Sequence, residues 1–151
     1  MKLKKMLFVL FFLTFLFPLL IYSQDVSVHY FIGKPKSDVI KKYGNPAHQD
    51  NSNPDMMCMF YQTKTTRMIF VSNKDGVFQS EATINYETEA KARNEVNDCI
   101  KSSVAEGFKV DTVSVNDFQL YRPGVKADLQ MSENKISKTY DVSVKAHKSE
   151  D

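Results

Sequence analysis

Apolar and polar residues alternate along much of the chain, and this alternation predicts a sheet. At 125–131 and again at 140–146, apolar side chains occupy every second position and charged or polar side chains fill the positions between them. Because neighbouring residues of a strand point to opposite faces, this pattern is typical of strands with one buried and one solvated face. We therefore predict two half-buried strands in this part of the chain.

Further strands are predicted on both sides of a helical segment. Asp75-Gly76 is the strongest turn signal, because this pair fits the left-handed positions of a tight hairpin turn. The runs around it predict a three-stranded antiparallel meander over 56–86. Shorter strand-like runs lie at 26–32, 108–115 and 118–122, and the segment 48–55 is predicted to be a polar loop.

The spacing changes to that of a helix in two places. Over 88–107, apolar side chains recur at helical spacing between a capping residue, Thr88, and a terminating residue, Gly107. A shorter helix is predicted over 37–43, with Ser37 as its cap and Gly44 as its left-handed end. These elements predict an α+β fold in which two helices pack on one face of an antiparallel sheet.

The order of elements also indicates a repeat within one domain over 24–151. A helix followed by strands occurs twice, in 33–86 and in 88–147, and Ser37–Lys42 matches Asn97–Ser102 when positions sixty apart are compared. Chance agreement would produce as much, since equal periods alone generate matches. We therefore keep a tandem helix-plus-meander repeat as one alternative and an unrelated pair of halves as the other.

The first 23 residues are typical of a secretory signal peptide. Lys2, Lys4 and Lys5 precede an apolar run over 6–22, which Pro18 interrupts and the small residue Ser23 follows. Cleavage near Gln24 would leave no membrane-spanning segment and would place the protein outside the cytoplasm, secreted or periplasmic. No cysteine lies directly after the apolar run, which argues against a lipid-modified N-terminus.

Removal of the leader changes the charge of the chain. Three of the 20 basic residues lie in the leader, so 17 basic residues remain against 18 acidic ones, a net charge of −1. The charges of both signs are scattered along the chain. Such a composition provides no electrostatic footprint for nucleic acid or for anionic lipid.

One short segment resembles a known family. Gly33, Val39, Tyr43, Gly44 and Pro46 have the spacing of the signature of the SmpA/OmlA class of outer-membrane assembly lipoproteins and of the β-lactamase-inhibitor-protein fold. The resemblance covers Gly33 to about Tyr86. It implies helices packed on an antiparallel sheet and a role in protein contact without catalysis. The lipidation cysteine of the lipoproteins is absent here, and the resemblance identifies no partner.

Residues suited to catalysis or metal binding are sparse. His29, His48 and His147 are predicted in three different environments, without a second ligand at metal spacing, and we interpret them as unrelated surface histidines. The chain has no nucleophile-elbow motif and no glycine loop for phosphate. We predict no cofactor, no metal and no enzymatic activity.

The two cysteines suggest one candidate binding surface. Export would place Cys58 and Cys99 where disulfides persist, and the sequence leaves open whether they bond. If they do, Cys58 faces the helices, and Met57, Met59 and Tyr61 lie on the opposite, open face, where thioethers beside an aromatic ring suit protein binding. One alternative is that this face is core and Cys58 faces solvent, and another is that a second layer covers both faces.

The sequence therefore predicts a binding module for another protein or for a component of the cell envelope. A small-ligand carrier is the first alternative, and it would require a pocket between the helices and the sheet. An enzyme with a scattered site is the second alternative, and it would require polar residues that converge in a cleft.

Overall fold

Eight strands form a single antiparallel sheet in the computed structural model, which describes residues 25–150. The predicted leader over 1–23 and its cleavage site before Gln24 lie outside the described residues. In chain order the strands are β1 (His48–Asp50), β2 (Met57–Gln62), β3 (Thr66–Asn73), β4 (Gly76–Tyr86), β5 (Lys109–Thr112), β6 (Asp117–Arg122), β7 (Val125–Asn134) and β8 (Thr139–Lys148). Their order across the sheet is β1-β2-β3-β4-β8-β7-β6-β5.

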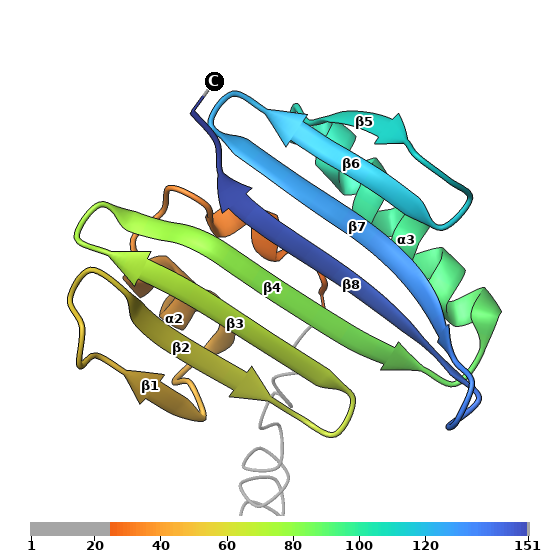
Figure 1. Ribbon diagram of the computed structural model, residues 1–151, viewed down its shortest axis with the longest axis horizontal. Helices are drawn as coiled ribbons and strands as arrows, with labels where there is room; N and C mark the ends of the chain where they lie inside the picture. The colour runs from red at the N-terminus through yellow and green to blue at the C-terminus, as the bar shows by residue number, and fades with distance from the viewer. Residues whose placement is uncertain (1–24, 151) are drawn as a thin grey trace, which may run out of the picture.

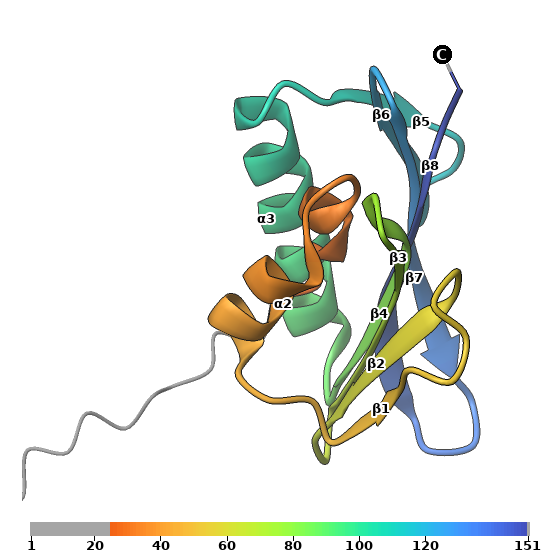
Figure 2. The same ribbon diagram turned by 90° about the vertical axis from the view of Figure 1, so that its left-hand side faces the viewer.

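Two α-helices and a short 3-10 helix cover one face of this sheet. They are α2 (Lys36–Tyr43), α3 (Glu89–Ala105) and η1 (Val28–Phe31). Figure 2 shows the sheet edge-on, with α2 and α3 on the same side of it. The predicted α+β fold, with two helices on one face of an antiparallel sheet, is confirmed.

Each half of the chain consists of one α-helix followed by a four-stranded meander. The halves meet where β4 pairs with β8, in a ladder that runs from the pair Gln79 and His147 to the pair Tyr86 and Tyr140. The strand order is therefore symmetric about this central ladder (Figure 1). The arrangement matches the helix-plus-meander organisation considered for 33–86 and 88–147, and common ancestry of the halves stays a prediction.

The core lies between the helices and the sheet. Alternate residues of β7 and β8 are buried there, and α3 contributes Ala92, Val96 and Cys99. Under α2, an aromatic cluster joins Phe31, Tyr43, Tyr61 and Phe70, with ring centroids 5.6 to 5.9 Å apart. Aromatic pairs at such distances add to the stability that burial of their area provides.

The long helix begins and ends at the residues that the sequence indicated. The Thr88 side chain accepts a hydrogen bond from the amide of Lys91, 3.3 Å away, and so caps α3. Gly107 follows the helix with φ +85°, a left-handed conformation that glycine adopts without strain. The short helix differs from the prediction: α2 begins at Lys36 after Pro35, so Ser37 lies inside the helix and is not its cap.

The loop before α2 is attached to the first residues of β4. The Gly33 amide donates to the Val77 carbonyl, and the Val77 amide donates to the Lys34 carbonyl, at 2.7 and 2.8 Å. Gly76 lies so close to this loop that a β-carbon there would be 2.8 Å from the Lys34 carbonyl oxygen. A glycine is therefore required at this approach as well as for the hairpin turn.

Two local predictions are wrong. The run 26–32 is no strand: its middle forms η1, and its alternating Val26 and Val28 are buried because the segment passes through the core between α3 and the sheet. The segment 48–55 is not entirely loop, since its first three residues form β1. This strand escaped sequence analysis because a three-residue edge strand with polar side chains has no apolar alternation to detect.

Candidate functional site

The sheet has one face that no described element covers. The helices pack against the opposite face, and in Figure 1 the viewer looks directly onto the uncovered one, with α2 and α3 behind the sheet. We call it the open face. It carries two features of different chemistry, an apolar patch at one side and a polar hollow at the other.

The apolar patch lies on β2 and β3. It consists of Cys58, Phe60, Ile69 and Val71, all half-buried. Cross-strand pairing brings them together, because Cys58 is opposite Val71 and Phe60 is opposite Ile69. The ring of His48, on β1, lies 5.6 Å from that of Phe60 and extends the patch to the edge of the sheet. Partly exposed apolar side chains gathered on an uncovered face are a feature of interaction surfaces.

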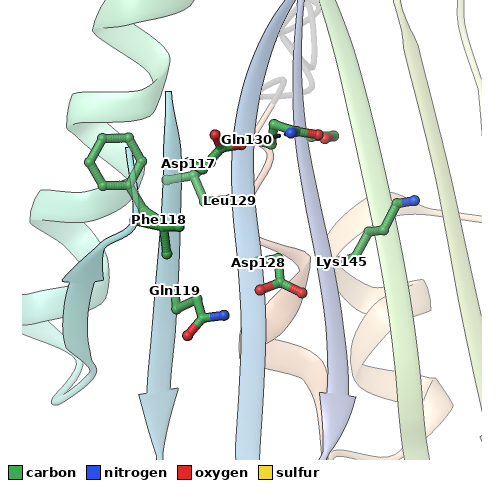
Figure 3. Close-up of a pocket in the computed structure, with 9 residues that line it drawn as sticks. Asp117, Phe118, Gln119, Asp128, Leu129, Gln130 and Lys145 are labelled. Atoms are coloured by element: carbon green, nitrogen blue, oxygen red, sulfur yellow. Dashed lines mark hydrogen bonds between the residues drawn. The ribbon is translucent and has the colours of Figure 1, made fainter. Parts of the chain in front are cut away.

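The polar hollow lies over β6, β7 and β8. It is a shallow, open depression of about 380 Å³. Figure 3 shows the labelled side chains Gln119, Asp128 and Lys145 on these three neighbouring strands. The polar side chains that line the hollow are Asp117, Gln119, Asp128, Gln130, Ser143 and Lys145.

Strand register aligns the patch and the hollow in one row across the open face. Lys145 is the cross-strand partner of Glu81 on one side and of Asp128 on the other. Beyond Glu81 the row reaches Ile69 of the apolar patch, and beyond Asp128 it reaches Gln119. Asp128 and Lys145 are exposed and make no ion pair or side-chain hydrogen bond within residues 25–150. These two groups are thus available to a partner.

One rim of the hollow is held by hydrogen bonds to Asp117. Ser114 Oγ donates to Asp117 Oδ2 at 2.5 Å, and Gln130 Nε2 donates to Asp117 Oδ1 at 2.6 Å. Both bonds favour the charged form, so they lower the pKa of the Asp117 carboxyl. Asp117 is therefore a fixed negative charge at this rim.

The predicted binding residues lie on the other face of β2. Met59 is fully buried, Tyr61 is buried against Tyr43 and donates its hydroxyl to the Gly44 carbonyl at 3.0 Å, and Met57 is half-buried beside Lys36 of α2. The prediction that Met57, Met59 and Tyr61 form an open surface is wrong. The alternation that groups them was correct, but their face packs under α2.

The orientation was wrong because it rested on a disulfide. Cys58 and Cys99 are both free. Cys58 lies on the open face, whereas Cys99 is a residue of α3 and is buried between this helix and the covered face of the sheet. The sheet separates the two sulfur atoms, and a disulfide cannot bridge that arrangement. Burial raises the pKa of the Cys99 thiol to about 12, so it is inert as a nucleophile.

We predicted that His29 is a surface histidine, and this prediction is wrong, because His29 is a fully buried core residue. Its Nε2 lies 2.9 Å from Ser103 Oγ, and Ser103 Oγ donates at 2.6 Å to the Cys99 carbonyl. With the serine hydrogen committed to that carbonyl, Nε2 carries the proton, and Nδ1 is a buried acceptor without a partner among the residues that the structure describes. Since His29 and Ser103 are fully buried, this pair is closed to substrate.

The residues of the family-like signature have structural roles. Val39 and Tyr43 are buried on the inner side of α2, and Gly33 and Gly44 have φ values of +83° and +77°. They orient the helix and its flanking loops on the sheet, and none lies on the open face. The resemblance to the SmpA/OmlA class stays a prediction.

Sequence analysis missed the open-face residues, although one signal pointed to them. Arg67 is exposed and alternates with Ile69 and Val71, so a charged residue marks their face of β3 as the solvated one. On the other face, Met68 and Phe70 are buried. Pairing of β2 with β3 then assigns Cys58 and Phe60 to the open face.

The described residues contain neither a metal-binding cluster nor a helix suited to cross a membrane. Within 25–150, no group of three or more His, Cys, Asp or Glu side chains is arranged to hold a metal ion. No helix in the same range has the length and hydrophobicity that a membrane crossing requires.

Comparison with known proteins assigns no family to the chain. No protein-family model and no curated protein matches it. A cysteine-rich secretory protein from Staphylococcus aureus aligns at 11% identity and a TM-score of 0.45, over 80% of this chain and 46% of that one. An extracellular SCP-domain protein from Bacillus anthracis aligns at 13% identity and a TM-score of 0.45, over 82% of this chain and 46% of that one. The chain thus spans less than half of either structure, and this similarity identifies no function for it.

Proposed function

We propose that this chain is an exported, non-catalytic module that binds another protein, or a component of the cell envelope, through the open face of its sheet. The observation that carries the proposal is the apolar patch, in which Cys58, Phe60, Ile69 and Val71 remain partly exposed on a face that no described element covers. Apolar surface of this kind gains free energy when a partner removes it from water.

The dimensions of the open face favour a macromolecule over a small ligand. Ile69 on β3 and Asp128 on β7 belong to the same cross-strand row and are separated by three strand spacings. At the usual spacing of strands this corresponds to about 14 Å. A partner that covers both the apolar patch and the polar hollow must present apolar and charged groups at that separation, as protein surfaces do.

The positions of the perturbed groups support a non-catalytic role. His29 and Cys99 have strongly shifted pKa values, which in an enzyme would make them candidates for the active site. Burial is the largest cause of both shifts, and both side chains lie in the core between α3 and the sheet. Their shifts are therefore explained by packing.

Site-specific photocrosslinking in the native host tests the proposal. The crosslinker replaces Phe60 on the open face, and in a matched control it replaces Lys101, an exposed residue of α3. We expect one reproducible protein adduct from position 60 and none from position 101. The adduct should disappear when Ile69→Lys places a charge in the patch and should persist with Lys91→Glu, on exposed helix surface.

Three results would contradict the proposal. The first is equal crosslinking from positions 60 and 101, and the second is no protein adduct from either position in intact envelopes. The third is an adduct at position 60 that Ile69→Lys leaves unchanged. Native mass spectrometry of the same preparations would reveal a bound small molecule and so favour the carrier alternative.

A further inference from the structure

The edge strand β5 has free hydrogen-bonding groups along its outer side. Among residues 25–150, β5 pairs only with β6, and Figure 1 shows it as the outermost strand at its edge of the sheet. The Val113 amide donates to the Asp117 carbonyl of β6 at 2.9 Å. Because antiparallel strands alternate between inward and outward groups, Asp111 and Lys109 also point their amides to β6. Val110 and Thr112 therefore point their amides and carbonyls outward.

The side chains along this edge alternate in sign on one face. Lys109 and Asp111 are opposite Tyr121 and Gln119, so both lie on the open face. The Lys109 ammonium lies 6.0 Å from the centre of the Tyr121 ring, which holds it over the sheet. Val110, between them, lies on the covered face and packs against the core.

We propose that two copies of this chain pair antiparallel along β5, about a two-fold axis at Val110, and so join their sheets edge to edge. In this register Val110 exchanges two backbone hydrogen bonds with the partner's Val110. Lys109 then faces the partner's Asp111, and Asp111 faces the partner's Lys109, as non-hydrogen-bonded pairs whose side chains are closest. The proposal is independent of the proposed binding function.

Charge and backbone geometry select this register over its neighbours. An axis at Lys109 or at Asp111 would oppose like charges and would place inward-pointing amides at the interface. An axis at Thr112 would satisfy the outward groups but would leave Lys109 and Asp111 without opposite charges. In the register about Val110, Val113 faces the partner's Gly107, which has no side chain to obstruct the approach.

Charged edge strands commonly prevent association, so the arrangement of the charges matters. Edges that carry charges of one sign repel a second copy. Here the two charges have opposite sign and are two residues apart, so the edge is complementary to itself about a two-fold axis. Pairing would also continue the open face, because the row that contains Tyr121 and Lys109 would meet the partner's Asp111 and Gln119.

Sedimentation equilibrium of the full chain, purified after expression with its own leader, tests the proposal. We expect a reversible dimer. Lys109→Asp and Asp111→Lys each create two like-charge pairs and should each weaken dimerisation by about ten-fold or more. The double exchange Lys109→Asp/Asp111→Lys restores both opposite pairs and should return the dissociation constant to within about three-fold of the wild-type value.

Further variants separate the edge from general effects of charge. Asp50→Lys makes the same charge change as Asp111→Lys on the other edge strand, β1, and should leave the dimer unchanged. Thr112→Pro removes an outward amide that β6 does not use, so it should abolish dimerisation while far-UV circular dichroism stays native. An equimolar mixture of Lys109→Asp and Asp111→Lys proteins should form a heterodimer in native mass spectrometry.

A wild-type protein that sediments as a monomer at about 100 μM overturns the proposal. So does a dimer that the double exchange fails to restore while both single variants remain folded. A dimer that Asp50→Lys weakens as much as Asp111→Lys overturns it as well, because the contact would then lie elsewhere.

Discussion

The buried histidine should make the fold sensitive to acid well above pH 4. Burial lowers the pKa of His29 from 6.5 to about 4, with a smaller lowering by Arg122 and an opposing effect of Asp25. The unfolded chain binds a proton at His29 below about pH 6.5, whereas the folded chain does not until about pH 4. Protonation of His29 therefore does not affect the free energy of unfolding above pH 6.5. It lowers the free energy of unfolding as the pH falls from 6.5 to about 4, because the unfolded chain gains a proton that the folded chain does not.

The size of the loss follows from the difference between the two pKa values. One pKa unit corresponds to about 1.4 kcal/mol, so His29 accounts for a loss of about 3 kcal/mol in the free energy of unfolding across this range. Such a loss is a large fraction of the stability of an ordinary domain, about 5–15 kcal/mol. We expect the urea midpoint to fall steeply between pH 6.5 and pH 4.5.

The assay is urea unfolding followed by far-UV circular dichroism at several pH values, because the chain has no tryptophan to report on unfolding. The comparison variant is His29→Gln, which keeps a side-chain donor for Ser103 Oγ and does not titrate. Glu95 provides an opposing slope in both proteins, since burial raises its pKa and favours the protonated folded state. The difference between the two proteins isolates His29.

Two results would refute this reasoning. The first is an identical pH dependence of stability in the wild-type and His29→Gln proteins. The second is an NMR titration in which the His29 imidazole of the folded protein has a pKa near 6.5, since its burial would then carry no penalty for charge.

Further predictions test the loop attachment, the thiols, the core and the helix cap. Gly76→Ala should lower the free energy of unfolding, measured with urea, by about 2–4 kcal/mol, because its β-carbon would meet the Lys34 carbonyl and φ is +118°. The control Gly124→Ala, where the β-carbon would enter open space, should lower it by about 1 kcal/mol, and equal losses would contradict the steric argument. In the folded protein Cys58 should react with iodoacetamide, and Cys99 should react only after urea exposes it. Intact mass should therefore show one adduct without urea and two with urea, and two adducts under native conditions would contradict the burial of Cys99. Met59→Ala should lower the free energy of unfolding by about 2–5 kcal/mol, and Ile69→Ala, on the open face, should lower it much less. The reverse order in urea unfolding would contradict the assignment of the two faces. Thr88→Ala should cost about 1 kcal/mol through loss of the α3 cap, and a midpoint equal to that of the wild type would show that the cap contributes nothing.

Alternation along the chain was sufficient to predict the strands that have a solvated face. Strands β7 and β8 lie where their alternating residues indicated, and the long helix begins after Thr88 and ends before Gly107. Alternation failed at 26–32, where every second residue is apolar but the segment lies in the helix layer. Periodicity reports which side chains are buried, and it does not report whether the backbone pairs with another strand.

The candidate site was harder to predict because it depends on relations between strands. Alternation separated Met59 and Tyr61 from Cys58 and Phe60 but could not tell which set the helices cover. The row through Glu81, Lys145 and Asp128 exists only because the register of three strands aligns them. The spacing of these three residues along the sequence does not reveal that they lie side by side.

The central position of β8 has a consequence for the order in which the chain folds. β8, the last of the described strands along the chain, lies in the middle of the sheet, between β4 and β7. A chain that emerges from its N-terminus can form β1 to β4 early, but β4 then keeps an unpaired edge until 139–148 arrive. The sheet therefore closes only after residues 139–148 have emerged. Contacts this distant in sequence also slow folding. Late closure would thus leave the first half of the sheet open at β4 until the second half is complete.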